Sequence, residues 1–166
     1  MEGARSGVMP WLLLLARVVA AGALVLAGVM KLGFIGGSAQ AENAPLVFAL
    51  SLQSFKLLPD ALVPVVTYFV PWCEVVAGGL MLLGVWSRQS GAVAAGMLLV
   101  FTLALGSVLV RGLPVECGCF GGLFGETKVT WANIAHNLVL AACAVAVAIA
   151  GGGALALKPD ETHPHQ

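Results

Sequence analysis

Two cysteines separated by a single glycine are the residues of this sequence best suited to chemistry. Cys117 and Cys119 lie in a glycine-rich segment, residues 111–125, between two long apolar runs. A disulfide across this spacing would close a very small ring, and strained disulfides are more easily reduced and more oxidising. Gly118 lacks the side chain that would obstruct such a turn. The spacing favours thiol–disulfide exchange, and an inert thiol pair in a tight turn is the alternative.

Three basic residues near these cysteines would favour the thiolate, which is the reactive form of cysteine. They are Arg111, Lys128 and His136, and Glu116 acts in the opposite direction. A metal site is a weaker interpretation, because zinc usually has four protein ligands and His136 is the only obvious third one. We therefore expect no metal site.

The last apolar run carries a stripe of polar residues. Asn133, His136 and Asn137 are spaced so that they share one side of a helix. Polar groups inside a membrane are costly and usually face the interior of a bundle. We expect this stripe to face inward, with His136 close to Cys117 and Cys119 as a proton donor or acceptor for thiol exchange. A hydrogen-bonded histidine that serves packing is an equally good interpretation.

An acidic residue lies in the middle of the second apolar run. A carboxylate at the position of Glu74 should be neutral or paired. The available cations are Arg17, Lys31 and Arg111, and long basic side chains reach over a helical turn or more, so depth does not choose among them. An interhelical pair that fixes packing is favoured over a proton relay or a ligand contact. With Asn133 and Asn137, these residues form the expected structural polar core.

Membrane-spanning helices are the elements that must position these residues. The chain is 60% hydrophobic and only 10% charged, whereas a soluble domain is about 25% charged. Four runs have the length of about 20 apolar residues that a membrane helix needs: residues 11–34, 62–86, 89–112 and 130–153. Lipid-exposed sheet edges cannot satisfy their backbone groups, so strands are excluded. We expect an all-α integral membrane four-helix bundle in one domain over residues 1–153, with a polar tail over 154–166.

A shorter helix is expected between the first two spans. Asn43 can cap it, and Pro59 would end it near Leu58. Its mixture of apolar and polar residues is typical of an amphipathic helix lying on the membrane surface. A plain linker is the alternative.

Charge suggests an orientation in the inner or plasma membrane. Four spans place both termini on one side, and Arg5 and Arg17 flank the start of the first span. Positive residues favour the cytoplasmic side, and their numbers on the two sides are nearly equal. Because the first helix usually dominates, we expect cytoplasmic termini and an external 113–129 loop. The first run is too long for a signal peptide, although Ala39–Gln40–Ala41 resembles a cleavage site. Membrane lipid is the expected partner, and nucleic acid is not, because no basic run occurs.

An ordered set of landmarks between about Arg17 and Ile149 resembles the MauE/DoxX-like family of membrane proteins. The landmarks are Arg17, Gly28, Lys31, Pro59, Pro71, Trp72, Glu74, Gly79, Arg111, Gly112, the CGCFG sequence at 117–121, Trp131 and Asn137. The resemblance implies a four-helix membrane fold, related in outline to vitamin K epoxide reductase-like bundles. It also implies a role like that of MauE proteins, which are associated with maturation of methylamine dehydrogenase, a disulfide-rich periplasmic enzyme. A thioredoxin-like redox partner is part of that expectation.

Two features depart from these relatives. His136 stands where the family often has arginine, which makes a positive charge there depend on pH. A Cys-x-x-Cys pair of the vitamin K epoxide reductase type is missing, so quinone reduction by that route is not supported. The leading hypothesis is a membrane thiol–disulfide redox protein. One alternative is a non-catalytic assembly subunit. The other is a bundle that binds a small molecule, and a quinone is the cofactor that this alternative implies.

Overall fold

The computed structural model describes residues 5–35, 38–113, 115, 128–151, 153 and 155–157. Within this part of the chain every regular element is helical, which confirms the all-α prediction. The helices are α1 (Arg5–Lys31), α2 (Ser38–Phe55), the short 3₁₀ turn η1 (Asp60–Leu62), α3 (Val63–Leu83), α4 (Ser87–Val110) and α5 (Trp131–Ala150).

Four of these helices are long and apolar enough to cross a membrane. They cover Val8–Lys31, Asp60–Leu83, Ser87–Val110 and Trp131–Ala150. These spans agree closely with the four predicted runs and differ from them at the ends, where local turns stop the helices. Gly84, for example, adopts a left-handed conformation with φ 71° and ends α3, as glycine commonly does after a helix. The four-span membrane bundle is therefore confirmed.

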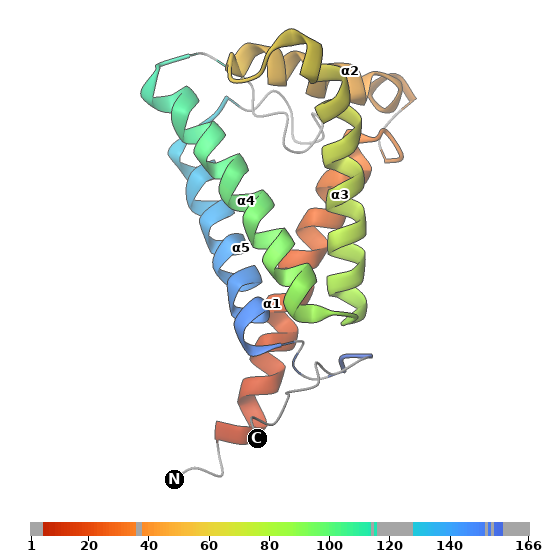
Figure 1. Ribbon diagram of the computed structural model, residues 1–166, viewed down its shortest axis with the longest axis vertical. Coiled ribbons are helices and arrows are strands. Elements are labelled where there is room, and N and C mark those ends of the chain that lie inside the picture. Colours follow the sequence, from red (N-terminus) through yellow and green to blue (C-terminus); the bar gives the residue numbers. More distant parts are fainter. Residues whose placement is uncertain are drawn as a thin grey trace.

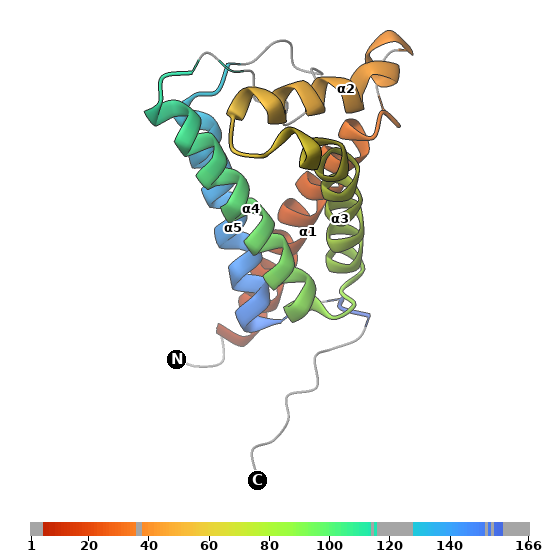
Figure 2. The same ribbon diagram turned by 45° about the horizontal axis from the view of Figure 1, so that its top comes forward.

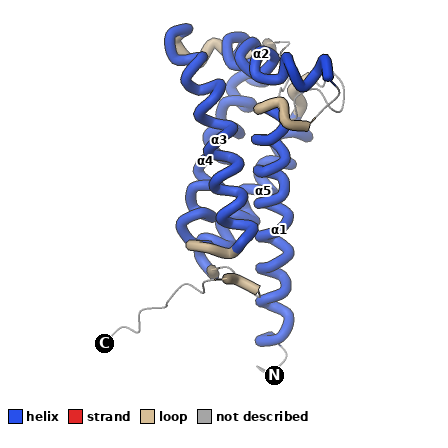
Figure 3. The backbone as a smooth tube through the Cα atoms, turned by 90° about the vertical axis from the view of Figure 1, so that its right-hand side faces the viewer, coloured by secondary structure: helices blue, strands red, loops and turns tan. Residues whose placement is uncertain are grey.

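The spans run roughly along one axis, and α2 lies across one end of them (Figures 1 and 2). The start of α1 and residues 155–157, the last ones that the structure describes, lie at the opposite end (Figure 3). Below, these two ends are called the α2 end and the terminus end. Helix α4 packs along α5, and α1 packs along α3. Helices α3 and α4 are close at the terminus end and diverge toward the α2 end (Figure 1).

Helix α2 is the predicted interfacial helix, although it begins and ends earlier than the sequence indicated. Its buried face includes Phe48, Leu52 and Phe55, whereas Leu46 and Leu50 on the opposite face are exposed. Phe48 and Leu52 form a hydrophobic cluster with Val63 at the start of α3, which holds the helix across the bundle. Apolar residues on both faces suit a helix that contacts protein on one side and the membrane surface on the other.

Glycine brings α1 and α3 into close contact. A Cβ atom added to Gly28 would lie 2.7 Å from the carbonyl oxygen of Pro71, and one added to Gly78 would lie 3.0 Å from that of Ala21. Small residues allow this approach of helix backbones, which drives helix association where lipid offers no hydrophobic effect. The packing of α1 against α3 thus depends on positions where a side chain has no room.

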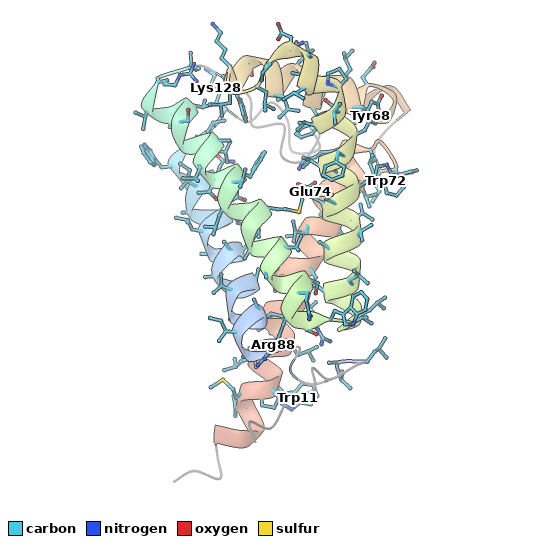
Figure 4. The ribbon with its side chains drawn as sticks, in the orientation of Figure 1. Trp11, Tyr68, Trp72, Glu74, Arg88 and Lys128 are labelled. Atoms are coloured by element: carbon cyan, nitrogen blue, oxygen red, sulfur yellow. The ribbon has the colours of Figure 1, made fainter. Side chains whose placement is uncertain are left out.

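Aromatic and basic side chains mark the two ends of the spans. Trp11 and Arg88 lie toward the terminus end, and Tyr68 lies nearer the α2 end (Figure 4). Trp11 and Tyr68 are exposed. Aromatic residues concentrate where membrane helices meet the interface, so these two positions agree with spans that cross a bilayer.

Candidate functional site

A buried ion pair joins α1 to α3. Lys31 Nζ donates to Glu74 Oε1 at 2.5 Å, and only 2% and 10% of the two side chains are exposed. Gly28 and Pro71 precede these residues by one turn on their helices, and Gly28 is packed on the Pro71 carbonyl. Because residues three apart share a helix face, the close contact at Gly28 directs Lys31 toward Glu74. Figure 4 shows Glu74 in the interior between α3 and α4.

Two phenylalanine rings complete the surroundings of the lysine ammonium group. Lys31 Nζ lies 5.1 Å from the ring centroid of Phe48 on α2 and 5.2 Å from that of Phe101 on α4. Both distances lie within the range of about 6 Å for an attractive cation–π contact. One ammonium group thus contacts residues of α2, α3 and α4 while it extends from α1.

A small cavity lies beside this pair, and we call it the polar cavity after the three polar residues in its lining. Its volume is about 40 Å³, and its lining includes Lys31, Glu74 and Asn137. Glu74 Oε2 and Asn137 Nδ2 are buried and have no hydrogen-bond partner among the described residues. The cavity is large enough for a water molecule, which needs roughly 10–15 Å³, but most of the residues that line it are apolar.

Of the predicted polar core, three residues meet at this place: Lys31, Glu74 and Asn137. Arg17 does not join them, because it precedes Lys31 by 14 positions on α1, or about 21 Å at 1.5 Å per residue. Arg17 is buried near the terminus end, where its Nη2 donates to the Leu155 carbonyl at 3.3 Å. Of the three cations proposed for Glu74, the structure selects Lys31.

Two other members of the predicted core lie at helix ends. Arg111 Nη1 donates to the carbonyl of Phe55, the last residue of α2, at 2.9 Å. Asn133 Oδ1 accepts hydrogen bonds from the Thr130 backbone N–H at 2.9 Å and from its hydroxyl at 2.6 Å. A cation at a helix C-terminus and a side-chain cap at an N-terminus both satisfy backbone groups that the helix leaves unpaired. Arg111 thus joins the end of α4 to the end of α2, and Asn133 caps the start of its own helix, α5.

The polar residues of α5 that were expected to face inward together do not all do so. Asn137 lines the polar cavity, whereas His136 is exposed on the surface of α5. Consecutive residues lie about 100° apart around a helix, so two neighbours can face the interior and the outside. The expectation that His136 faces inward with the asparagines was wrong.

The cysteines that prompted the redox hypothesis, Cys117 and Cys119, lie outside the described residues. The residues on either side of their segment are described, and the Val129 N–H donates to the Val115 carbonyl at 3.0 Å. Val115 and Val129 pack in one hydrophobic cluster with Phe55 of α2. The other two cysteines, Cys73 and Cys143, are free thiols within the spans.

The sequence did not indicate a large apolar groove between α3 and α4. Its volume is about 540 Å³, and it lies where these helices diverge beneath α2. Its lining combines apolar residues of α2, α3 and α4 with one charged residue, Glu74. The ion pair therefore lies between the polar cavity and the apolar groove.

Together, the fold and the site define a class: a multi-pass membrane helix bundle whose helices converge on a buried lysine–glutamate pair. The family model described as "Methylamine utilisation protein MauE" matches residues 9–150. The chain belongs to this MauE family.

Two curated relatives carry the same description. The methylamine utilization protein MauE of Paracoccus denitrificans is 38% identical over 100 residues, covering 58% of this chain and 52% of the relative. The protein of that name from Paracoccus versutus is 36% identical over 111 residues, covering 65% of this chain and 54% of the relative. The chain thus spans about half the length of the curated relatives it matches. No solved structure matches it.

Proposed function

We propose that this protein is a membrane thiol–disulfide redox protein that supports maturation of an extracytoplasmic enzyme in methylamine utilisation. Cys117 and Cys119 are the exchanging pair. When their disulfide accepts two electrons and two protons from a partner dithiol, it becomes two thiols and the partner gains a disulfide; the reverse transfer balances in the same way. A thioredoxin-like protein is a suitable partner, because its own reaction is this exchange.

The observation that carries the proposal is the fixed base of the segment containing the two cysteines. Val115, two positions before Cys117, is hydrogen-bonded to Val129 and packed against the α2 end of the bundle. Both described ends of the segment, Val115 and Val129, thus lie at the α2 end, which supports a position of its cysteines where a partner can reach them. Lys128 and Arg111 lie at its base as exposed cations, which favour a thiolate nearby. His136 is exposed on the second turn of α5 and is our candidate proton donor or acceptor.

The α2 end faces the outside of the inner membrane in this proposal, and the termini are cytoplasmic. Arg17 and Arg88 lie toward the terminus end, and positive residues at the first span favour the cytoplasmic side. An external position suits the chemistry, because disulfides form and persist in oxidising compartments.

The proposal predicts that loss of Cys117 and Cys119 abolishes function while loss of the other two cysteines does not. The test uses a host that lacks its own MauE protein, is grown on another carbon source with methylamine added as inducer, and is complemented with this chain. The Cys117→Ser/Cys119→Ser variant should leave active methylamine dehydrogenase at the level of the empty vector, with free thiols in that enzyme accessible to alkylation. The measurements are enzyme activity and thiol alkylation, alongside immunoblotting of the membrane protein.

The matched control is the Cys73→Ser/Cys143→Ser variant, which removes two free thiols from the spans and should retain function. If the Cys117→Ser/Cys119→Ser variant supports as much active enzyme as the unaltered chain, the redox proposal fails.

A non-catalytic assembly subunit is the second candidate. Helix α2 supports it, because Leu46, Val47 and Leu50 are exposed on a helix that lies across the bundle end. Such a surface suits contact with a membrane partner. This candidate predicts function without Cys117 and Cys119, and stoichiometric co-purification with a partner that is lost when Leu46 and Leu50 are changed to serine.

A further inference from the structure

The apolar groove between α3 and α4 has the dimensions of a ligand site. Its volume of about 540 Å³ lies within the range of roughly 300–1,000 Å³ that small-molecule sites occupy. Val93 and Val100 of α4 line it and are 52% and 68% exposed, which places its mouth on the outer surface of a membrane span. A molecule dissolved in the bilayer can therefore enter sideways between the helices.

The lining of the groove includes one carboxylate and two aromatic rings close to it. Glu74 lines both the groove and the polar cavity, and its Oε2 is buried without a partner among the described residues. Phe48 and Phe101 also line the groove. A carboxylate oxygen accepts hydrogen bonds and donates none when ionised, so its complement is a ligand O–H group.

This combination discriminates between possible occupants. A lipid acyl chain would fill the apolar part but would leave Glu74 Oε2 unpaired, and an unpaired buried acceptor is unfavourable. An aliphatic alcohol would supply the O–H group but no ring for the two phenylalanines. A hydroquinone with a hydrocarbon tail supplies an O–H group, an aromatic face for offset or edge contacts and an apolar tail for the remaining length.

We propose that this groove binds a membrane-soluble hydroquinone, with one hydroxyl donating to Glu74 and the tail leaving between α3 and α4. The oxidised quinone has no O–H donor and binds less tightly. The inference concerns binding alone and does not rest on the proposed thiol chemistry, because its residues are separate from Cys117 and Cys119.

Binding of decylhydroquinone to the purified full-length protein in detergent tests the inference. Equilibrium dialysis under nitrogen with the radiolabelled compound would measure affinity, with decylbenzene and decan-1-ol as competitors that lack the hydroxyls or the ring. We expect decylhydroquinone to bind at least roughly tenfold more tightly than either competitor. Decylbenzene lacks the hydrogen bond to the charged Glu74, and decan-1-ol lacks the ring that contacts the two phenylalanines. Equal competition by decylbenzene or decan-1-ol would identify the groove as a hydrocarbon site and overturn the inference.

A pair of glycine variants locates the site. Gly96 lines the groove, and a Cβ added there meets no atom within 4 Å. Gly96→Leu should therefore fill the groove without disturbing the backbone and abolish measurable binding. Gly22 on α1 has equally open surroundings but does not line the groove, so Gly22→Leu should bind as the unaltered protein does. Unchanged binding in Gly96→Leu would place the ligand elsewhere.

A variant without the ion pair distinguishes binding of the hydroquinone hydroxyl by Glu74 from binding of the hydrocarbon tail in the groove. In Lys31→Met/Glu74→Leu the groove remains but the carboxylate is absent, so decylhydroquinone should lose its advantage over decylbenzene. Retention of that advantage would show that Glu74 does not receive the hydroxyl.

Discussion

Replacing Glu74 with leucine is expected to lower the free energy of unfolding by about 3–5 kcal/mol, the usual effect of breaking a buried ion pair by removing one partner. The reason is the Lys31 ammonium group, which is 2% exposed and would lose its carboxylate. Contacts with the rings of Phe48 and Phe101 would remain, but these are worth only about 0.5–2 kcal/mol each. The measurement is helix content by circular dichroism during titration of detergent-solubilised protein with dodecyl sulfate.

The double variant Lys31→Met/Glu74→Leu separates the charge from the packing. Both side chains keep similar volumes and neither carries a charge, so the double variant should recover most of the stability lost in Glu74→Leu. Replacement of buried pairs by apolar residues is often neutral or stabilising. Asp60→Asn serves as a control for loss of an acidic residue, because Asp60 is exposed. A Glu74→Leu variant as stable as the unaltered protein would show that the pair does not hold α1 to α3.

Changing Gly28 to alanine is expected to destabilise the bundle by about 1–3 kcal/mol, the usual range for overpacking. The added Cβ would lie 2.7 Å from the Pro71 carbonyl oxygen, and neither backbone can move without separating α1 from α3. Lys31 and Glu74 follow these residues by one turn, so their contact should lengthen as well. The same dodecyl sulfate titration reports the change.

Gly22→Ala is the matched control, because a Cβ at Gly22 on the same helix meets nothing within 4 Å. Alanine favours a helix over glycine by up to about 1 kcal/mol, so Gly22→Ala should be neutral or stabilising. Opposite signs for the two substitutions are the expected result. Equal effects would mean that the close approach at Gly28 does not limit the packing.

The spans could be predicted from sequence because their signal is local. A run such as 89–112 is apolar along its whole length, and no other structure satisfies its backbone in lipid. The start of α2 was less predictable. The helix begins at Ser38 and continues through Pro45, whereas the sequence pattern indicated Asn43 as its cap.

The partner of Glu74 could not be predicted, because the choice depends on how two helices are aligned along each other. Arg17 and Lys31 lie on the same helix, and the close contacts at Gly28 and Gly78 align α1 with α3 so that the lysine lies beside Glu74. The same limit applies to His136 and Asn137. Adjacent polar residues indicate a polar region of the helix, but the packing of α5 decides which of them faces the interior.

The apolar groove had no sequence signal, because it arises from the divergence of α3 and α4 beneath α2. Phe48, Phe101 and Val100 are ordinary membrane residues when each is considered alone. Their arrangement around Glu74 depends on interhelical angles that no local pattern records.

The central claim, that Cys117 and Cys119 form an external redox-active pair, is tested most directly by labelling them in intact cells. A membrane-impermeant maleimide would be added before and after mild reduction to cells carrying the Cys73→Ser/Cys143→Ser chain. The proposal predicts labelling of both cysteines only after reduction, which would identify an extracytoplasmic disulfide. Labelling without reduction, or labelling only after cell lysis, would contradict it, the first by showing free thiols and the second by placing the cysteines away from the external surface.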